Sequence, residues 1–288
     1  MKPSTPGGSW LGEDWVTLVV EESYIIHAEA ILSRISTCSF PPPQTVLGVQ
    51  KPDTMSRTRV QLVPFDADSP DHAARMVHQR TECGWHADAV PAWQEAQRTG
   101  QKCIFWIAIY PLDPDGKSRL AKHISHFPKE REPLNDTASS VRATARTPTR
   151  TPFHPVGHIS LDAANPATKR LNLPVPPDNL YWIKSLYVSY ALQSAGIGRA
   201  AMDEVEAMAT SPPLDAKVLM LDTVAREDQH RKQFVAQMPG RPPPMSTQEW
   251  YARRGYKLVW SEKNFYPDLD RDGKPLGRTT VFMRRDLA

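Results

Sequence analysis

The sequence has few cysteines and no unbroken hydrophobic run, and both shortages exclude classes of protein. Its three cysteines, Cys38, Cys83 and Cys103, have no metal-ligand spacing, and an odd number gives no disulfide framework. Residues 15–35 are apolar but carry several charged side chains, so they form neither a membrane span nor a signal sequence. We therefore expect a soluble protein of a reducing compartment, in the cytoplasm or the nucleus, without a metal or a membrane partner.

The chain also has little net charge. Its 35 Lys and Arg residues nearly balance its 32 Asp and Glu residues, which argues against nucleic acid as the main partner. One basic run, Arg142, Arg146 and Arg150, lies among Thr, Ser and Pro and is expected to be a solvated linker. Proline is in excess, because 28 residues are nearly twice the usual share of about 5%. The proline clusters mark loops and breaks.

These breaks divide the chain. Residues 1–57 are expected to be an N-terminal extension that the fold does not need, and Met55, just before the first strand, raises the hypothesis of a native start there. Residues 58–288 form one domain, since 40% hydrophobic residues can supply its core. Residues 111–152 are too long for an ordinary loop, so we expect partial disorder. Residues 224–247 form a second polar insertion.

Hydrophobic patterns predict the elements between these breaks. Apolar runs predict strands at residues 58–65, 103–110, 155–161, 180–188, 217–224, 257–261 and 279–284. Periodicity and caps predict helices that begin at Ser69, span residues 90–98, follow Gly198 and span residues 246–254. The predicted order is therefore β-α-α-β-β-β-α-β-α-β-β.

The most informative motif is the glycine loop at residues 193–198, Gln-Ser-Ala-Gly-Ile-Gly, which stands between a strand and a helix. Glycines let the backbone approach an anion closely, and the helix start directs N–H groups and a positive dipole end at it. One hypothesis is a dinucleotide site, because residues 196–201 fit GxGxxA and Asp222 stands roughly where a ribose-binding acid belongs. Against it, eight residues separate Val188 from Gly196.

A second hypothesis uses more of the chain. The loop resembles the Q/R-x-x-G-x-G/A motif of the GNAT superfamily of acyl-CoA-dependent N-acetyltransferases, and Leu186-Tyr187-Val188 stands at the matching distance ahead of it. Val156-Gly157-His158-Ile159-Ser160 resembles the third strand of these enzymes. Residues 250–256, Trp-Tyr-Ala-Arg-Arg-Gly-Tyr, resemble their late aromatic segment. The resemblance covers residues 58–286.

The resemblance implies a fold and a cosubstrate site. The fold would be an α/β domain with a central, mostly antiparallel twisted sheet, flanking helices and a splay at the acyl-CoA site. Acetyl-CoA would be the cosubstrate, and the backbone would bind it through Leu186, Tyr187, Val188, Gln193, Ser194, Ala195, Gly196, Ile197, Gly198, Arg199 and Ala200.

The resemblance also implies catalytic candidates. Tyr251 matches the family tyrosine that protonates the departing thiolate, and its ordinary pKa of about 10 keeps it protonated at pH 7. The strand at residues 180–188 carries Lys184 where many family members carry a glutamate, so the base is open between Asp222, His158 and a water relay.

The leading function is transfer of an acetyl group to a primary amine, on a small molecule or a peptide, by direct attack in a ternary complex. The alternative is a noncatalytic acyl-CoA-binding or interaction module. Trp85 and Trp93 are candidates to line the amine pocket or to fill the core between two helices. The sequence fixes neither the amine nor the oligomeric state.

Overall fold

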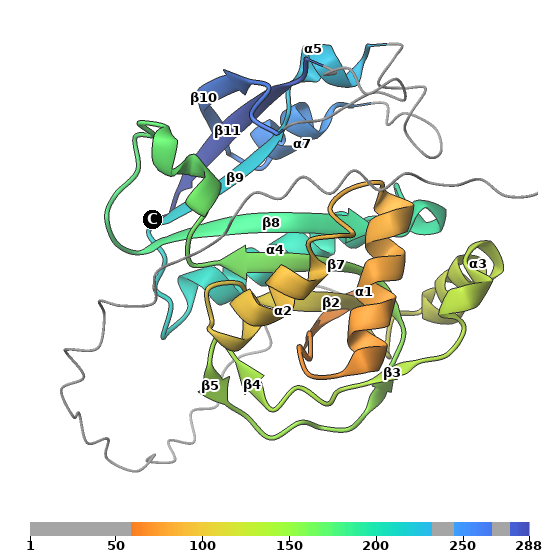
Figure 1. Ribbon diagram of the computed structural model, residues 1–288. Helices are drawn as coiled ribbons and strands as arrows, with labels where there is room; N and C mark the ends of the chain where they lie inside the picture. The colour runs from red at the N-terminus through yellow and green to blue at the C-terminus, as the bar shows by residue number, and fades with distance from the viewer. Residues whose placement is uncertain (1–58, 232–244, 267–276, 288) are drawn as a thin grey trace, which may run out of the picture. The chain divides into compact units, whose positions relative to one another are not determined.

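A computed structural model describes residues 59–231, 245–266 and 277–287 (Figure 1). All of them belong to one unit that begins at Asp53. The expected extension at residues 1–57, with its hypothetical start at Met55, lies outside the described residues.

The centre of the described chain is a seven-stranded sheet with the order β1-β2-β7-β8-β9-β11-β10. Its strands are β1 (Val60–Pro64), β2 (Ile104–Ile109), β7 (Pro155–Asp162), β8 (Leu180–Val188), β9 (Val218–Val224), β10 (Lys257–Lys263) and β11 (Thr279–Asp286). All neighbouring strands are antiparallel except β8 and β9, which are parallel. The predicted mixed, mostly antiparallel sheet is therefore confirmed.

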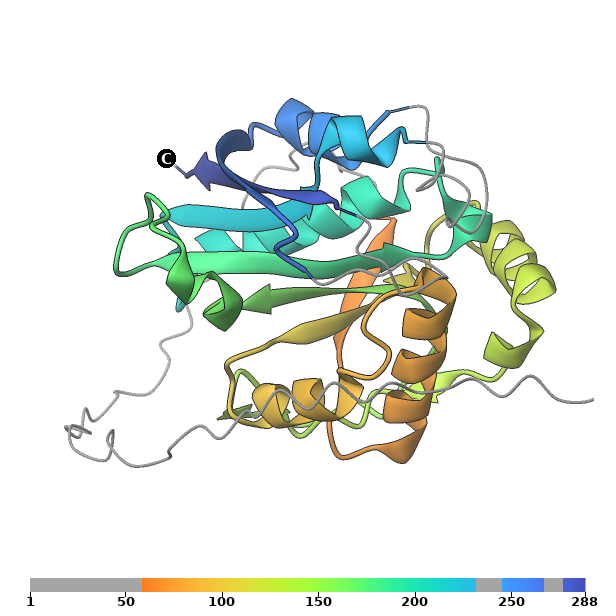
Figure 2. The same cartoon turned by 45° about the horizontal axis from the view of Figure 1, so that its top comes forward.

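Helices cover both faces of this sheet (Figures 1 and 2). On one face, α1 (Pro70–Cys83) and α2 (Val90–Arg98) enclose a core that includes Met76 and Trp106. On the other, α4 (Ile197–Thr210) and α7 (Thr247–Arg253) enclose a larger core that includes Ile197 and Tyr251. A third apolar cluster surrounds Trp182. With the elements of residues 116–153 and short α5 (Arg226–Gln229) set aside, the main elements follow the predicted order.

Local signals set the helix boundaries. The Ser69 side chain accepts a hydrogen bond from the His72 N–H group at 3.3 Å, and Gly84 ends α1 with a φ of 79°. Ser246 and Glu249 form a reciprocal capping box at the start of α7. The cap at Ser69 is the one that the sequence predicts.

The segment at residues 111–152 differs from the expectation of partial disorder. It contains α3 (Gly116–His126), η1 (Pro128–Glu130) and the short strand pairs β3 (Leu134–Asn135) with β6 (Pro152–Phe153) and β4 (Ser140–Val141) with β5 (Thr144–Ala145). Arg146 donates to both carboxylate oxygens of Asp136, at 2.6 and 2.8 Å, and this bond holds the pKa of Asp136 down at about 2. Arg146 is thus a structural partner rather than part of a solvated run.

Remaining short elements connect the strands. They are the 3₁₀ helices η2 (Pro166–Arg170) and η3 (Tyr190–Leu192). The second predicted insertion, residues 224–247, falls largely outside the described residues. No described helix has the length and apolar character needed to cross a membrane.

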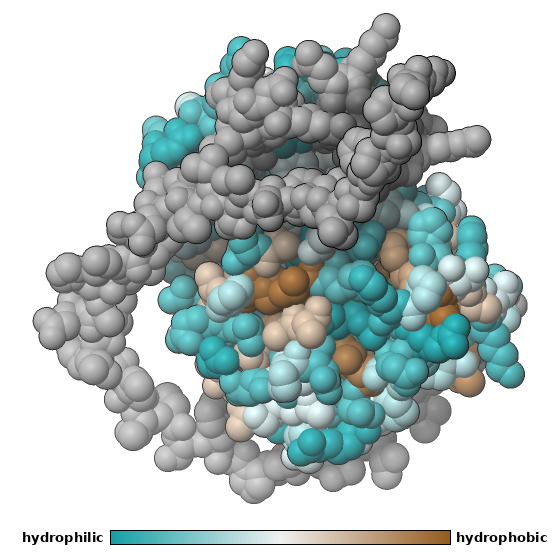
Figure 3. All heavy atoms as spheres, turned by 45° about the vertical axis from the view of Figure 1, so that its right-hand side comes forward, coloured by the Kyte–Doolittle hydropathy of each residue, from teal (hydrophilic) through white to brown (hydrophobic). Residues whose placement is uncertain are grey.

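The described surface has only scattered apolar side chains. Figure 3 shows a mainly hydrophilic side with small hydrophobic areas. The large apolar side chains that are exposed are Val77, Leu112, Leu258 and Trp260. Such isolated residues are ordinary on protein surfaces.

Candidate functional site

The strands β8 and β9 stop pairing a third of the way along β8. Only Leu180, Tyr181 and Trp182 pair with β9, opposite residues 218–220. Beyond Trp182, β8 continues to Val188 beside β7 alone, while β9 diverges from it (Figure 1). We call the place where this pairing is lost the splay. One side of β8 therefore has no strand partner there, which exposes backbone groups to a ligand.

A β-bulge bends β8 at the splay. His158 pairs with Tyr187 and Ser160 with Lys184, so Ser185 and Leu186 together oppose one residue of β7. Ser185 has a φ of 55°, in the left-handed region. The bulge therefore lies just beyond Trp182, the last residue of β8 that pairs with β9.

Gly157 permits the close approach of β7 to the bent part of β8. A Cβ atom at residue 157 would lie 2.1 Å from the carbonyl oxygen of Tyr187. No other residue fits this position without moving the backbone, which explains the glycine in the strand motif.

Backbone groups of Leu186 and Val188 face the splay. The N–H group of Ser189 donates to the Val156 oxygen on β7 at 2.8 Å, and the Tyr187 oxygen also lies beside β7. Because successive strand residues direct their N–H and C=O groups to opposite sides, those of Leu186 and Val188 face away from β7. Of the three residues expected to bind the cosubstrate here, Tyr187 has backbone groups that face β7 rather than the splay.

The glycine loop leads into an uncapped helix start. Ser194 and Gly196 have φ values of 65° and 82°, and Gly196 is the N-cap of α4 without any side-chain cap. The first helical bond runs from the Ala200 N–H group to the Gly196 oxygen at 3.0 Å. The N–H groups of Ile197, Gly198 and Arg199 therefore have no partner within the helix, and they point toward its positive dipole end.

The loop and the free side of β8 adjoin each other. A Cβ atom on Gly198 would contact the Val188 side chain at 3.7 Å. The amides at the start of α4 and the backbone of Leu186 and Val188 thus form one continuous set of donors and acceptors. The expected residues of this set are brought together, apart from Tyr187.

Arg59 adds a cation that the sequence did not reveal. Its Nη1 donates to the Ala195 oxygen at 3.2 Å, and a Cβ atom on Gly196 would lie 3.4 Å from that nitrogen. Arg59 is separated from the loop by 136 residues along the chain. No sequence pattern joins two such distant segments.

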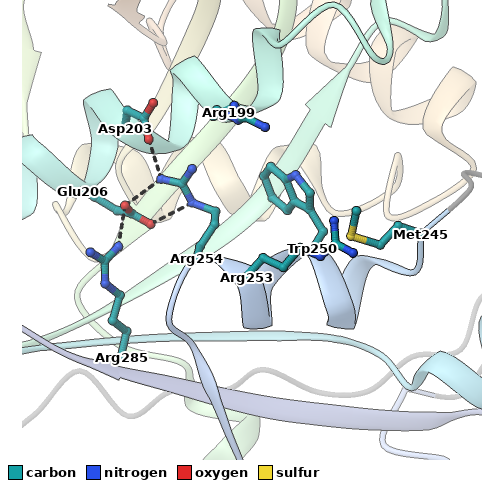
Figure 4. A pocket seen from close by; sticks show the side chains of 8 residues that line it. All are labelled: Arg199, Asp203, Glu206, Met245, Trp250, Arg253, Arg254 and Arg285. Atoms are coloured by element: carbon teal, nitrogen blue, oxygen red, sulfur yellow. Dashed lines mark hydrogen bonds and ion pairs between the residues drawn. The ribbon is translucent and has the colours of Figure 1, made fainter.

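A basic pocket lies beside the start of α4 (Figure 4). Its lining residues are Arg199, Asp203, Glu206, Met245, Trp250, Arg253, Arg254 and Arg285. Arg254 pairs with Asp203 and Glu206, each at 2.7 Å, and Arg285 pairs with Glu206 at 2.6 Å. Among the described residues, Arg199 and Arg253 have no carboxylate partner, so the pocket has excess positive charge.

Tyr251 lies under the sheet on the α4 side. Its ring contacts those of Trp250 and Tyr256, with centroids 4.9 and 6.0 Å apart. Burial, together with the charge of Asp222, raises the pKa of Tyr251 above its usual value. The hydroxyl is therefore protonated at pH 7. It has no hydrogen-bond partner in the part of the chain that the structure describes, so its proton is available to a ligand.

Asp222 is tied to Lys184 across the splay. The Lys184 ammonium pairs with one Asp222 oxygen, and the Tyr266 hydroxyl donates to the other at 2.9 Å. Burial lowers the pKa of Lys184, but the charge of Asp222 and the hydrogen bonds to Asp222 and Tyr266 outweigh it and raise the pKa overall. Lys184 is therefore charged, and the Asp222 carboxylate is held in an ion pair with it. Tyr266, which sequence reasoning missed, completes this cluster.

His158 lies on the other face, closed to solvent. It is 0% exposed, and burial, followed by the charges of Arg80 and Lys102, lowers its pKa well below 6.5. Arg80 donates to Nε2 at 3.3 Å, so Nδ1 carries the proton that is donated to the Gln79 oxygen at 3.0 Å. This neutral histidine is not brought together with Tyr251.

The dinucleotide hypothesis does not fit this arrangement. A dinucleotide fold has an open, mostly parallel sheet, whereas only β8 and β9 are parallel here. The glycine loop follows η3 rather than a strand, and Asp222 is held by Lys184. No group of three or more His, Cys, Asp or Glu side chains could hold a metal within the described ranges.

Comparisons with known proteins give matches among solved structures only. No protein-family model matches the chain, and no curated protein does. An acetyltransferase of the GNAT family from Desulfovibrio desulfuricans matches with 13% identity and a TM-score of 0.42, over 80% of this chain and 99% of its own. Arabidopsis thaliana NAA60 with a bisubstrate analogue matches with 11% identity and a TM-score of 0.44, over 79% and 97%.

A GNAT-family acetyltransferase from Elizabethkingia anophelis with bound acetyl-CoA matches with 12% identity and a TM-score of 0.40, over 80% of this chain and 100% of its own. At such identities and TM-scores below 0.5, these matches carry no argument about the site, which stands on its own geometry. Two of these three solved structures are named as GNAT-family acetyltransferases, the family that the sequence motifs resemble.

Proposed function

We propose that the protein transfers an acetyl group from acetyl-CoA to an amine, on a small molecule or a peptide. The observation that carries this proposal is the continuous set of backbone groups at the splay. Amides at the start of α4 suit a pyrophosphate, and the free edge of β8 beside them suits an extended chain with amide groups. Coenzyme A has both parts in this order.

The residues present fit the cosubstrate. The pyrophosphate would accept from the N–H groups of Ile197, Gly198 and Arg199, with Gln193 to Gly196 shaping the loop around it. Leu186 and Val188 would pair with the amide-bearing arm as a neighbouring strand would. Arg59 and Arg199 supply positive charge near the phosphates without carboxylate partners in the described chain.

The chemistry requires three things of the protein. The amine must be neutral, the thioester carbonyl must be polarised, and the departing sulfur must be protonated. The amine nitrogen attacks the carbonyl carbon, the C–N bond forms and the C–S bond breaks. Tyr251 gives its hydroxyl proton to the sulfur and regains one from solvent, while water takes the proton that the amine loses.

Water is the proposed relay because neither expected base is free. Asp222 is paired with Lys184, and His158 is buried against Arg80 and Gln79. The lack of a free base at Asp222 and His158 favours one alternative function, a noncatalytic acyl-CoA-binding module. An ion pair in place of a free carboxylate is compatible with binding alone.

Two measurements on the full chain separate the possibilities. Titration calorimetry with acetyl-CoA tests the backbone site, and thiol release with small amines, polyamines and peptides tests transfer. Heat together with thiol release supports the enzyme, and heat without thiol release from any amine supports the binding module. No heat with acetyl-CoA contradicts both.

A further inference from the structure

A cluster of cations lies on the α1 and α2 face of the splay. The cluster consists of Arg80 on α1, Lys102 before β2 and Lys184 on β8. Burial is the main cause that lowers the pKa of Lys102, and the charges of Lys184 and Arg80 lower it further. Ser185, at the bulge, ties this cluster to the splay because its hydroxyl lies 3.5 Å from the Lys102 nitrogen.

Two of these cations have a carboxylate partner. Lys102 pairs with Asp162 at 2.8 Å, and Lys184 pairs with Asp222. Arg80 has none among the described residues, although it is only 4% exposed. Buried charges in proteins are normally paired, because an unpaired buried ion loses its hydration free energy and no opposite charge offsets that loss.

The immediate contacts of Arg80 are all neutral. Its Nε donates to the Trp85 oxygen at 2.7 Å, its Nη1 donates to His158, and its guanidinium lies 5.2 Å from the centre of the Trp93 ring. Burial lowers the pKa of Arg80, and the groups that offset this are Cys83, Tyr190 and Tyr187, which carry no charge at pH 7. Nη2 has no hydrogen-bond partner within the described residues.

The position of Arg80 suits an acceptor. The proposed cosubstrate site begins at α4, on the opposite face of the sheet, which leaves the α1 and α2 side for the amine. Trp85 and Trp93, which the sequence offered as lining residues, both stack with cations here: Trp93 with Arg80 and Lys102, and Trp85 with Arg278 at 4.1 Å. These aromatic and cationic groups disfavour a polycationic acceptor.

We propose that the acceptor is an amine that also carries a carboxylate, and that this carboxylate pairs with Arg80. The inference rests on the proposed acetyl transfer. A guanidinium with an unused nitrogen is the side chain best matched to a carboxylate, and the pair would neutralise the buried charge. The substrate class is therefore that of amino acids and related small amino-carboxylates.

The test uses pairs of acceptors that differ only in this charge. Glycine, β-alanine and γ-aminobutyrate are each compared with their carboxamides, by thiol release from acetyl-CoA at fixed pH. The ratio of kcat/KM for acid over amide is measured for the wild type, Arg80→Gln, Arg80→Lys and the surface control Arg98→Gln. Differences in amine basicity cancel when these ratios are compared between variants.

We expect at least one acid to be preferred by the wild type, and Arg80→Gln to reduce that preference about 10- to 100-fold, as for a charged hydrogen bond. Arg80→Lys should retain part of it, and Arg98→Gln all of it. If Arg80→Gln fails to fold, the test rests on two ratios: the wild type should prefer an acid, and Arg80→Lys should show a smaller preference for it.

Equal use of acid and amide by the wild type, an unchanged ratio in Arg80→Gln, or no turnover of any acid would overturn the inference. Failure of the proposed function is distinguishable, because acetyl-CoA would then give no heat, or heat but no thiol release with any amine. Acetylation of the amides or of polyamines alone would support acetyl transfer and reject only the proposal that the acceptor carries a carboxylate.

Discussion

The two faces of the splay present different chemical groups to a ligand. On the α4 side, the donors are backbone N–H groups of one short loop and one strand end, while on the α1 and α2 side the site consists of charged side chains from distant segments. Backbone donors suit the constant part of a cosubstrate, because any chain with that loop supplies them. Side-chain charges suit the variable partner, because each can be changed alone.

The largest effect is expected from breaking the ion pair on the side-chain face. Asp222→Asn leaves the Lys184 ammonium without its counter-ion, at a site where Asp222 is 9% and Lys184 19% exposed. We expect a loss of about 3 kcal/mol in the free energy of unfolding, measured by urea denaturation. The control Asp68→Asn, in an exposed pair with Arg98, should cost less than about 1 kcal/mol.

Removing both charges sharpens this test. Lys184→Met combined with Asp222→Leu should recover most of the lost stability, because two buried charges then disappear together. A loss below 1 kcal/mol for Asp222→Asn would show that the pair is solvated and that the contrast between the two faces is overstated.

A smaller effect is expected on turnover from Tyr251, which faces the splay from the α4 side. Tyr251→Phe removes the acid but keeps the ring packed against Trp250 and Tyr256. Thiol release should fall about 100-fold, the lower range for general acid catalysis, with acetyl-CoA affinity retained by calorimetry. Tyr181→Phe is the control, since Tyr181 contacts Arg142 instead. Unchanged turnover would reject the role of Tyr251.

The pH dependence of stability reports on the α1 face. The pKa of His158 is lowered in the folded state, so its contribution to stability is complete above the unfolded value of about 6.5 and is lost as the pH falls below it. Between pH 6.5 and 5, His158→Gln should reduce the slope of the unfolding free energy by about 1 kcal/mol per pH unit. Equal slopes would mean that His158 titrates normally.

The smallest effect concerns Arg59, a side-chain cation that donates to the Ala195 oxygen of the glycine loop. Arg59→Gln should weaken acetyl-CoA binding about fivefold, near 1 kcal/mol, and the loss should shrink as salt is added. Arg98→Gln is again the control. An effect as large as 100-fold would mean that side chains, not the backbone, dominate on this face.

The contrast between the faces also explains what the sequence could predict. The order of the main elements, the caps at Ser69 and Ser246, and the glycine loop are local patterns, and the structure has them in place. The order in residues 111–152 was missed because it depends on polar contacts such as Asp136 with Arg146, which leave no hydrophobic period.

The candidate site divides in the same way. The loop at residues 193–200 could be found because its donors are consecutive, whereas Arg59, Tyr266 and the unpaired Arg80 act across long sequence separations. Beyond the bulge at Ser185, the backbone groups of Tyr187 face β7, because one extra residue changes the side that each following backbone group faces. A single sequence does not specify such pairings.

The central claim is that backbone N–H groups at the start of α4 bind the cosubstrate, and Arg199 tests it directly. Arg199→Ala removes the side chain, while Arg199→Pro also removes the N–H group, which has no partner within the helix. Titration calorimetry with acetyl-CoA should show binding about tenfold weaker for Arg199→Pro than for Arg199→Ala, as for one charged hydrogen bond. Equal affinities of the two variants, with both folded, would contradict the account.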